Sequence, residues 1–229
     1  MNRRNFISKS LAAGAAATLA SGASASAQSG SVKIVGVSCS PRKGKTTATA
    51  VKAALDAAKK VDPRITTEMI DLGEMEIAGW TGGAKPGEAK ETMDDFKLIL
   101  PSFKAPDLGG VIIGSPSYFR SMSSLCKAFL ERLAVLRSPK LMLADKAVGV
   151  LSVGAYRNGG QELVISQIQA AMLCHEVVLV GGKPKAHQGA TLWNAYKDDI
   201  TKDEFGMATA AQLGIRVAEA ALDMAAAKP

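Results

Sequence analysis

The chain has 229 residues, of which 47% are hydrophobic and 21% charged, which is enough apolar material for one well-packed domain and argues against a second. The formal net charge is +7, but three of the 28 basic residues lie in an N-terminal segment that we expect to be removed. The remaining 25 Lys and Arg are spread along the chain among 21 Asp and Glu, so the charge pattern argues against a nucleic-acid partner.

The N-terminal segment has the three parts of an export signal. A basic head with Arg3 and Arg4 precedes a weakly apolar stretch over residues 11–20, and small residues follow. The paired arginines and the Ala-rich, Leu-poor middle resemble a twin-arginine signal, which directs folded proteins to the periplasm. We therefore expect a signal peptide over residues 1–27 and one domain over residues 28–229. No later stretch of about 18 strongly apolar residues predicts a membrane span.

Short β-branched runs then alternate with helix-like stretches. We expect strands over residues 32–38, 65–71, 110–115, 147–153 and 177–180, and helices over residues 46–60, 88–100, 123–136, 162–174 and 208–224. This alternation predicts an α/β fold, a doubly wound five-stranded parallel sheet in a three-layer α/β/α arrangement. Ligands bind such sheets at the loops that follow the strands, so functional residues should lie there.

The first polar loop, over residues 38–47, leads from a strand into the N-terminus of a helix. Unpaired backbone N–H groups and the positive end of the helix dipole favour an anion at that position. Hydroxyl and cationic donors in the loop are Ser40, Arg42, Lys45, Thr46 and Thr47. Such donors predict a phosphate site without a metal. The simpler alternative is a turn in which a threonine only starts the helix.

Two other phosphate chemistries fit the first loop less well. Residues 39–46 read Cys-Ser-Pro-Arg-Lys-Gly-Lys-Thr, which lacks only the first glycine of a P-loop. P-loop enzymes also need an acidic magnesium ligand at the end of a buried strand, and the predicted strands over residues 110–115 and 147–153 contain none. A phosphatase with Cys39 as nucleophile would need an arginine where Lys45 stands.

The segment from Ser40 to Thr46, Ser-Pro-Arg-Lys-Gly-Lys-Thr, resembles the FMN-phosphate loop of iron–sulfur flavoproteins and related NAD(P)H-dependent FMN reductases. The family usually has Asn where Lys45 stands, and lysine retains a donor while it adds charge. The second loop, over residues 114–123, is similar to the family's segment along the isoalloxazine ring and ribityl chain. In isolation, a plain strand-turn-helix connection would explain this loop equally well.

The third loop, over residues 154–162, contains two adjacent glycines that let the backbone approach a planar ring closely. Amide donors near Asn158 and Gly159 can bond the pyrimidine edge of a flavin, although an ordinary glycine-rich turn is the simpler alternative. The resemblance, in this loop order, implies a flavodoxin-like FMN site. Its residues are Ser38, Ser40, Arg42, Lys45, Thr46 and Thr47 from the first loop, Pro116, Ser117, Tyr118, Phe119 and Ser121 from the second, and Gly154, Arg157, Asn158, Gly159, Gly160 and Glu162 from the third.

The chain departs from the iron–sulfur flavoproteins just after the second predicted strand. Those relatives carry closely spaced cysteines there, whose thiolates hold a four-iron cluster, whereas residues 77–83 contain none. Asp94 and Asp95 still resemble the acidic pair that follows those cysteines. Trp80 fits a core, lid or dimer position equally well. We expect the cysteines to be small core residues and the histidines to be structural; these are Cys39, Cys126, Cys174, His175 and His187.

The resemblance implies an FMN-dependent oxidoreductase in which the flavin carries the chemistry, so no side chain is predicted as acid, base or metal ligand. Electrons would pass from NAD(P)H or a redox protein to a quinone, a metal ion or a similar acceptor. Because nicotinamide cofactors are scarce outside the cytoplasm, an FMN-binding electron-transfer protein without a small-molecule substrate is the alternative. A cofactor-free binding protein is a third possibility. The resemblance also implies a homodimer or tetramer.

Overall fold

The structure, a computed structural model, describes residues 30–80, 94–184 and 186–227. The expected signal peptide over residues 1–27 lies outside this part of the chain, as does the start of the helix expected over residues 88–100. In the described residues, no helix has the length and apolar character needed to cross a membrane.

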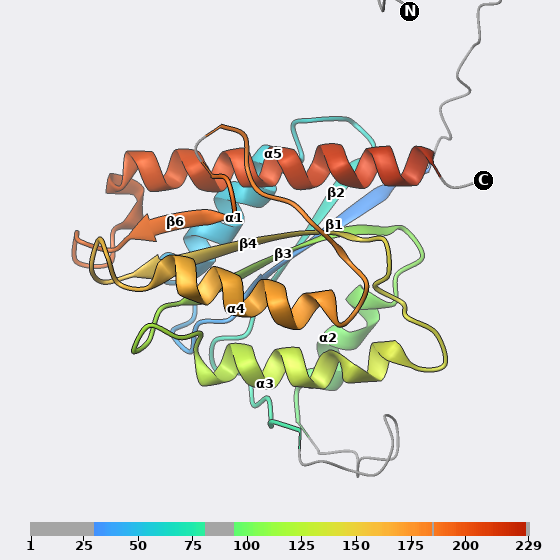
Figure 1. Ribbon diagram of the computed structural model, residues 1–229, viewed down its shortest axis with the longest axis horizontal. Coiled ribbons are helices and arrows are strands. Elements are labelled where there is room, and N and C mark those ends of the chain that lie inside the picture. The colour runs from blue at the N-terminus through green and yellow to red at the C-terminus, as the bar shows by residue number, and fades with distance from the viewer. Residues whose placement is uncertain (1–29, 81–93, 185, 228–229) are drawn as a thin grey trace, which may run out of the picture.

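A parallel sheet forms the centre of the fold (Figure 1). Its strands are β1 (Val32–Ser38), β2 (Ile65–Asp71), β3 (Leu108–Pro116), β4 (Ala147–Gly154), β5 (Val178–Leu179) and β6 (Ala190–Trp193). The strand order is β2-β1-β3-β4-β5, and β6 also pairs with β4. All pairs are parallel, and the order reverses between β1 and β3. The doubly wound α/β prediction is confirmed, and the carboxyl ends of β1 and β3 mark the expected ligand edge.

The outer strand position next to β4 is shared by two short strands, whereas the sequence predicts a single fifth strand over residues 177–180. β5 pairs with the first residues of β4, and β6 pairs with Leu151 to Gly154 at its other end. The run Gly181-Gly182-Lys183-Pro184 follows β5 and interrupts strand formation, since glycine and proline are unfavourable in strand interiors. The sixth strand was missed because it has only four residues.

Helices cover both faces of the sheet (Figure 1). They are α1 (Thr46–Ala58), α2 (Phe96–Phe103), α3 (Ser124–Arg132), α4 (Gln161–Leu173) and α5 (Glu204–Ala226). α1 and α5 pack on one face, and α2, α3 and α4 pack on the other, so the sheet separates two apolar cores. The three-layer prediction is confirmed. The helix expected over residues 123–136 ends earlier, and the 3₁₀ helix Leu133–Arg137 continues it.

Two of the three cysteines occupy the core as expected. Cys39 follows β1 and Cys126 lies in the first turn of α3, and both are fully buried in the core under α3 and α4. The prediction for Cys174 is wrong, because this residue caps the C-terminus of α4 and is exposed. His175 is buried, whereas His187 is exposed.

Candidate functional site

The first loop leaves the carboxyl end of β1 and leads into α1. Ser38 and Ser40 are buried, and the Ser40 hydroxyl accepts the Arg42 N–H at 3.2 Å. The Ser38 hydroxyl has no hydrogen-bond partner within the described part of the chain. The Ser123 hydroxyl donates to the Cys39 carbonyl at 2.6 Å, which ties the first loop to the start of α3. The beginning of this loop is therefore fixed from inside the protein.

The N-terminus of α1 is open to an anion. Thr46 and Thr47 are buried in its first turn, and the N-cap residue Lys45 makes no side-chain cap. The turn contains no acidic residue. Uncapped N–H groups at the positive end of a helix dipole bind anions, and the neighbouring Lys45 adds a positive charge. This geometry fits the phosphate predicted from the sequence.

Asp71, at the end of β2, holds the middle of the first loop in place. Its carboxylate accepts the Gly44 N–H at 2.7 Å and the Gly73 N–H at 3.2 Å. Gly73 packs so closely that a Cβ atom there would lie 2.5 Å from the backbone of Lys43. The loop is thus shaped without a ligand, and the sequence analysis missed Asp71 because its role depends on a strand that is adjacent only in the sheet.

The second loop contains a strained turn at the same edge. Pro116 is buried where β3 ends, and the Tyr118 and Ser121 backbones pair at 2.9 and 3.0 Å. Between them, Phe119 and Arg120 both have positive φ, 51° and 63°, in the left-handed region that costs a non-glycine residue about 1–2 kcal/mol. The Phe119 side chain is fully exposed. The turn therefore presents an aromatic ring to solvent beside the first loop.

The third loop is bonded directly to the second. The Ser117 hydroxyl donates to the Gly159 carbonyl at 2.5 Å, and an Arg120 Nη1 donates to the Asn158 carbonyl at 3.3 Å. Gly160 has φ +88°, and a Cβ atom there would lie 2.7 Å from the Arg120 Cα, so only glycine fits this approach. The two loops that were expected to contact the isoalloxazine ring form one unit.

Four other expected cofactor residues lie at or near this unit. Gly154 is buried at the end of β4, and Arg157 and Glu162 are exposed on either side of the glycines. The Ser121 hydroxyl donates a hydrogen bond of 2.9 Å to the side-chain oxygen of Gln167 in α4. The structure thus brings all three predicted loops to one edge of the sheet, with Glu162 on the outward first turn of α4.

A fourth loop at this edge was not predicted. It follows β6, whose Trp193 pairs in register with Gly154 and donates from its indole nitrogen to the Ala155 carbonyl at 3.2 Å. The guanidinium of Arg157 stacks 4.4 Å above the Trp193 ring. The fourth loop also carries Asp198, whose carboxylate pairs with Arg42 at 2.8 Å. Its signal in the sequence is the short run Ala-Thr-Leu-Trp at residues 190–193, for which the sequence analysis predicts no strand.

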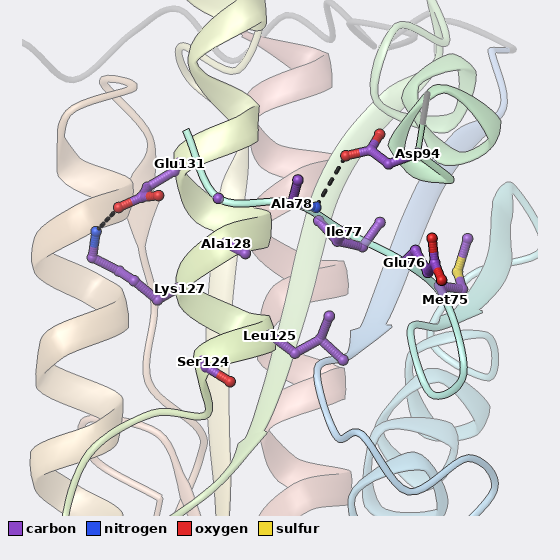
Figure 2. Close-up of a pocket in the computed structure, with 11 residues that line it drawn as sticks. Met75, Glu76, Ile77, Ala78, Asp94, Ser124, Leu125, Lys127, Ala128 and Glu131 are labelled. Carbon is purple, nitrogen blue, oxygen red and sulfur yellow. Dashed lines mark hydrogen bonds and ion pairs between the residues drawn. The ribbon is translucent and has the colours of Figure 1, made fainter. Parts of the chain in front are cut away.

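A separate cavity of about 760 Å³ lies between α3 and the segment that follows β2 (Figure 2). We call residues 75–80 together with α3 the β2–α3 flank. Apolar lining comes from Met75, Ile77, Leu125 and Ala128, and charged lining from Glu76, Asp94, Lys127 and Glu131. By the family resemblance, the segment after β2 in this flank corresponds to the one in which iron–sulfur flavoproteins carry their cysteines.

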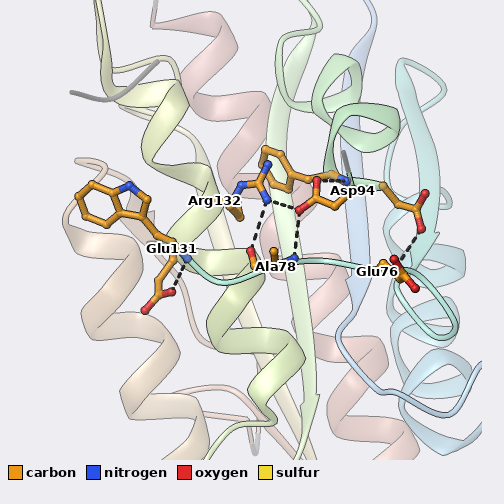
Figure 3. A network of polar contacts seen from close by, with 8 residues as sticks. Glu76, Ala78, Asp94, Glu131 and Arg132 are labelled. Atoms are coloured by element: carbon orange, nitrogen blue, oxygen red, sulfur yellow. Dashed lines mark hydrogen bonds and ion pairs between the residues drawn. The ribbon is translucent and has the colours of Figure 1, made fainter. Parts of the chain in front are cut away.

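A buried ion pair holds the flank together (Figure 3). Arg132 bonds the Asp94 carboxylate and lies 4.8 Å above the Phe96 ring, and the Ala78 N–H donates to Asp94 at 3.0 Å. Burial by itself would raise the pKa of Asp94, but the bonds from Arg132 and from backbone N–H groups hold that pKa below its ordinary value. The Trp80 side chain is exposed, and the backbone N–H of Trp80 donates to the Glu131 carboxylate, so Trp80 is not a core residue.

The structure also bears on the alternative chemistries. Burial, together with the neighbouring Cys126 thiol, raises the pKa of Cys39 well above its ordinary value, which disfavours the thiolate that a cysteine phosphatase needs. Among the described residues, no three His, Cys, Asp or Glu side chains are placed to hold a metal ion. The open N-terminus of α1 fits a phosphate-bearing ligand.

Comparison with known proteins identifies the family of this chain. The profile of the NADPH-dependent FMN reductase family matches residues 32–191. The chain belongs to this family. An iron–sulfur flavoprotein of Methanocaldococcus jannaschii is 37% identical over 191 residues, which cover 82% of this chain and 96% of the relative. An NAD(P)H dehydrogenase (quinone) of Archaeoglobus fulgidus is 27% identical over 140 residues, covering 59% of this chain and 72% of that protein.

The fold agrees with that assignment. A WrbA-like flavodoxin of Agrobacterium tumefaciens superposes with a TM-score of 0.58 at 18% identity, over 83% of this chain and 98% of the other. The protein is therefore a flavin-dependent oxidoreductase with a flavodoxin-like fold, and FMN is its cofactor. The uncapped α1 N-terminus fits the phosphate of such a group.

An iron–sulfur cluster does not fit this chain. The sequence has three cysteines, whereas a four-iron cluster is held by four. Cys39 and Cys126 are buried in the core, and Cys174 ends α4 and is exposed. The name of the Methanocaldococcus relative therefore describes a cofactor that these residues cannot hold.

Proposed function

We propose that this family member binds FMN with its phosphate at residues 40–47 and its ring between the second and third loops. The observation that carries this assignment is the open N-terminus of α1, preceded by a loop that is already shaped. Bound FMN supplies hydride and electron transfer. Residues of the first loop would hold the phosphate, and residues of the second and third loops would hold the ring.

Arg42 tests the phosphate assignment. Its guanidinium lies on the first loop, half exposed, where it can make a charge-assisted bond to an anion. Arg42→Ala should weaken FMN binding by ~1.5–3 kcal/mol, measured as quenching of flavin fluorescence during titration of the apoprotein. Riboflavin, which lacks the phosphate, should bind the variant and the wild type equally. Unchanged FMN affinity would reject the role given to Arg42.

The donor and acceptor are also part of this proposal. The family name supports NADPH as donor, and the Archaeoglobus relative's name supports a quinone as acceptor. Anaerobic mixing of the flavin-loaded protein with NADPH should bleach the flavin band rapidly, and a soluble quinone should restore it. A protein that is bleached only by a reduced redox carrier would instead be an electron-transfer protein without a small-molecule substrate, which the twin-arginine-like segment favours.

Export and assembly complete the proposal. Arg3 and Arg4 support delivery to the periplasm through the twin-arginine pathway, with FMN inserted before transport. Changing both to Lys should keep the precursor in the cytoplasm, and normal periplasmic delivery would contradict the signal assignment. A homodimer or tetramer is supported by the family resemblance alone. Light scattering of the purified protein measures the molar mass of the assembly and so tests this oligomeric state directly.

A further inference from the structure

The ion pair between Arg42 and Asp198 joins two loops that are 156 residues apart. One Arg42 nitrogen, Nη1, donates to both carboxylate oxygens, at 3.0 and 2.8 Å. Arginine carries five N–H donors in a planar fork, so most donors stay available for a second anion. Within the described residues, Nε and Nη2 of Arg42 make no bond. The pair therefore fixes the guanidinium without using all its hydrogen-bonding capacity.

Asp198 is itself held in place. The Asn194 amide donates to its Oδ1 at 2.8 Å, and the backbone turn from Tyr196 to Asp199 closes with a hydrogen bond of 3.0 Å. Inside that turn Lys197 and Asp198 have positive φ, 49° and 69°. Lysine does not favour this region, whereas aspartate tolerates it. Bonds from Asn194 and Arg42 hold the pKa of Asp198 below its ordinary value, so the carboxylate stays charged at neutral pH.

We propose that Asp198 is a positioning residue of the phosphate site, which holds the Arg42 guanidinium ready at the loop that leads into α1. This inference rests on the phosphate assignment proposed above. An exposed arginine loses rotamer freedom when it binds an anion, and a partner that fixes its side chain beforehand reduces that loss. The remaining Arg42 donors then meet the phosphate. In the described part of the chain, the Asp198 carboxylate bonds Arg42 and Asn194 and also interacts electrostatically with Lys45.

The test compares FMN with riboflavin, since the two ligands differ only in the phosphate. In Asp198→Asn the side chain keeps its size and tolerates the left-handed turn, but loses its charge. We expect FMN to bind about two- to fivefold more weakly, the range of an exposed ion pair, while riboflavin affinity stays unchanged. Asp199→Asn is the matched control, because its carboxylate bonds Thr201 and Lys202 and does not contact Arg42.

A second variant pair separates positioning from a general electrostatic effect. If Asp198 acts through Arg42, Asp198→Asn should have no further effect on FMN affinity once Arg42→Ala is present. Tighter or unchanged FMN binding in Asp198→Asn overturns the inference, as does an equal loss for riboflavin. Failure of the wild-type protein to bind FMN would instead reject the proposed function itself, so the two failures are distinct.

Discussion

The carboxyl edge of the sheet and the β2–α3 flank are fixed by different chemistry. At the edge, backbone groups and short polar side chains connect four loops, as where Asp71 accepts two N–H groups and Ser117 bonds the third loop. On the flank, the ion pair between Asp94 and Arg132, the bond from the Trp80 backbone N–H to Glu131 and apolar packing hold the segment after β2 to α3. The edge carries the residues that the family resemblance assigns to FMN, whereas residues 75–80 of the flank contain no cysteine.

This difference suggests which region determines cofactor binding. The edge has an open helix N-terminus, which favours an anion. The flank directs its charges at its own backbone, because Asp94 and Arg132 both bond Ala78. Variants of the two regions should therefore differ in the property they change. Flank variants should change stability, and edge variants should change flavin affinity.

Asp94→Ala should have the largest effect. It leaves the Arg132 guanidinium in a site where only 17% of that side chain is exposed. Breaking such a pair should lower the free energy of unfolding by about 2–4 kcal/mol, measured by urea denaturation. FMN affinity of the folded variant should stay within twofold of wild type. The control Lys127→Ala breaks an exposed pair with Glu131 on the same flank and should lower stability by about 1 kcal/mol or less.

Acid should reproduce part of the Asp94 effect. The folded-state pKa of Asp94 lies below its ordinary value, so the unfolded chain binds the proton more readily. The ordinary pKa of aspartate is about 4, and above this pH the ion pair stabilises the fold in full. This stabilisation is lost as the pH falls through the lower pKa that Asp94 has in the folded state. The stability difference between wild type and Asp94→Asn should therefore shrink in acid. An unchanged difference from pH 6 to pH 3 would contradict the ion-pair explanation.

The layers and the three loops of the edge were predictable because they depend on local patterns. β-branched runs marked the strands, and polar residues after them marked the loops that a parallel sheet brings to one edge. The glycines of the third loop are predicted to approach a planar ring, and in the structure Gly160 instead approaches the backbone of Arg120. Where strand and loop were each continuous in the sequence, the prediction and the structure agree.

The remaining parts of the edge depend on contacts between distant residues. β6 has only four residues, and it is recognised as a strand by its pairing with the distant β4, so the fourth loop and Asp198 were missed. The strained turn at Phe119 was missed because left-handed conformation is unusual for a bulky residue. The exposure of Cys174 depended on which face α4 turns to the sheet, and its local pattern did not determine this.

Gly73→Ala tests the point where the two regions meet. Gly73 begins the segment that becomes the flank, and its close contact with the Lys43 backbone shapes the first loop of the edge. A new Cβ atom 2.5 Å from that backbone should lower the free energy of unfolding by about 1–3 kcal/mol. FMN affinity should fall as well, more than riboflavin affinity. Gly30→Ala, where a Cβ atom meets open space, should change neither quantity.

Phe119→Asn should have the smallest effect on stability and the opposite sign. The phenylalanine ring is fully exposed and contributes no packing, while its φ of 51° is unfavourable for a bulky residue and tolerated by asparagine. The variant should therefore be more stable by about 1 kcal/mol in urea denaturation. Tyr118→Asn, outside the positive-φ pair, should bring no such gain. If Phe119→Asn is also slower in passing electrons to a quinone, the strain is maintained because the exposed ring contacts the acceptor; equal rates would leave the strain without that function.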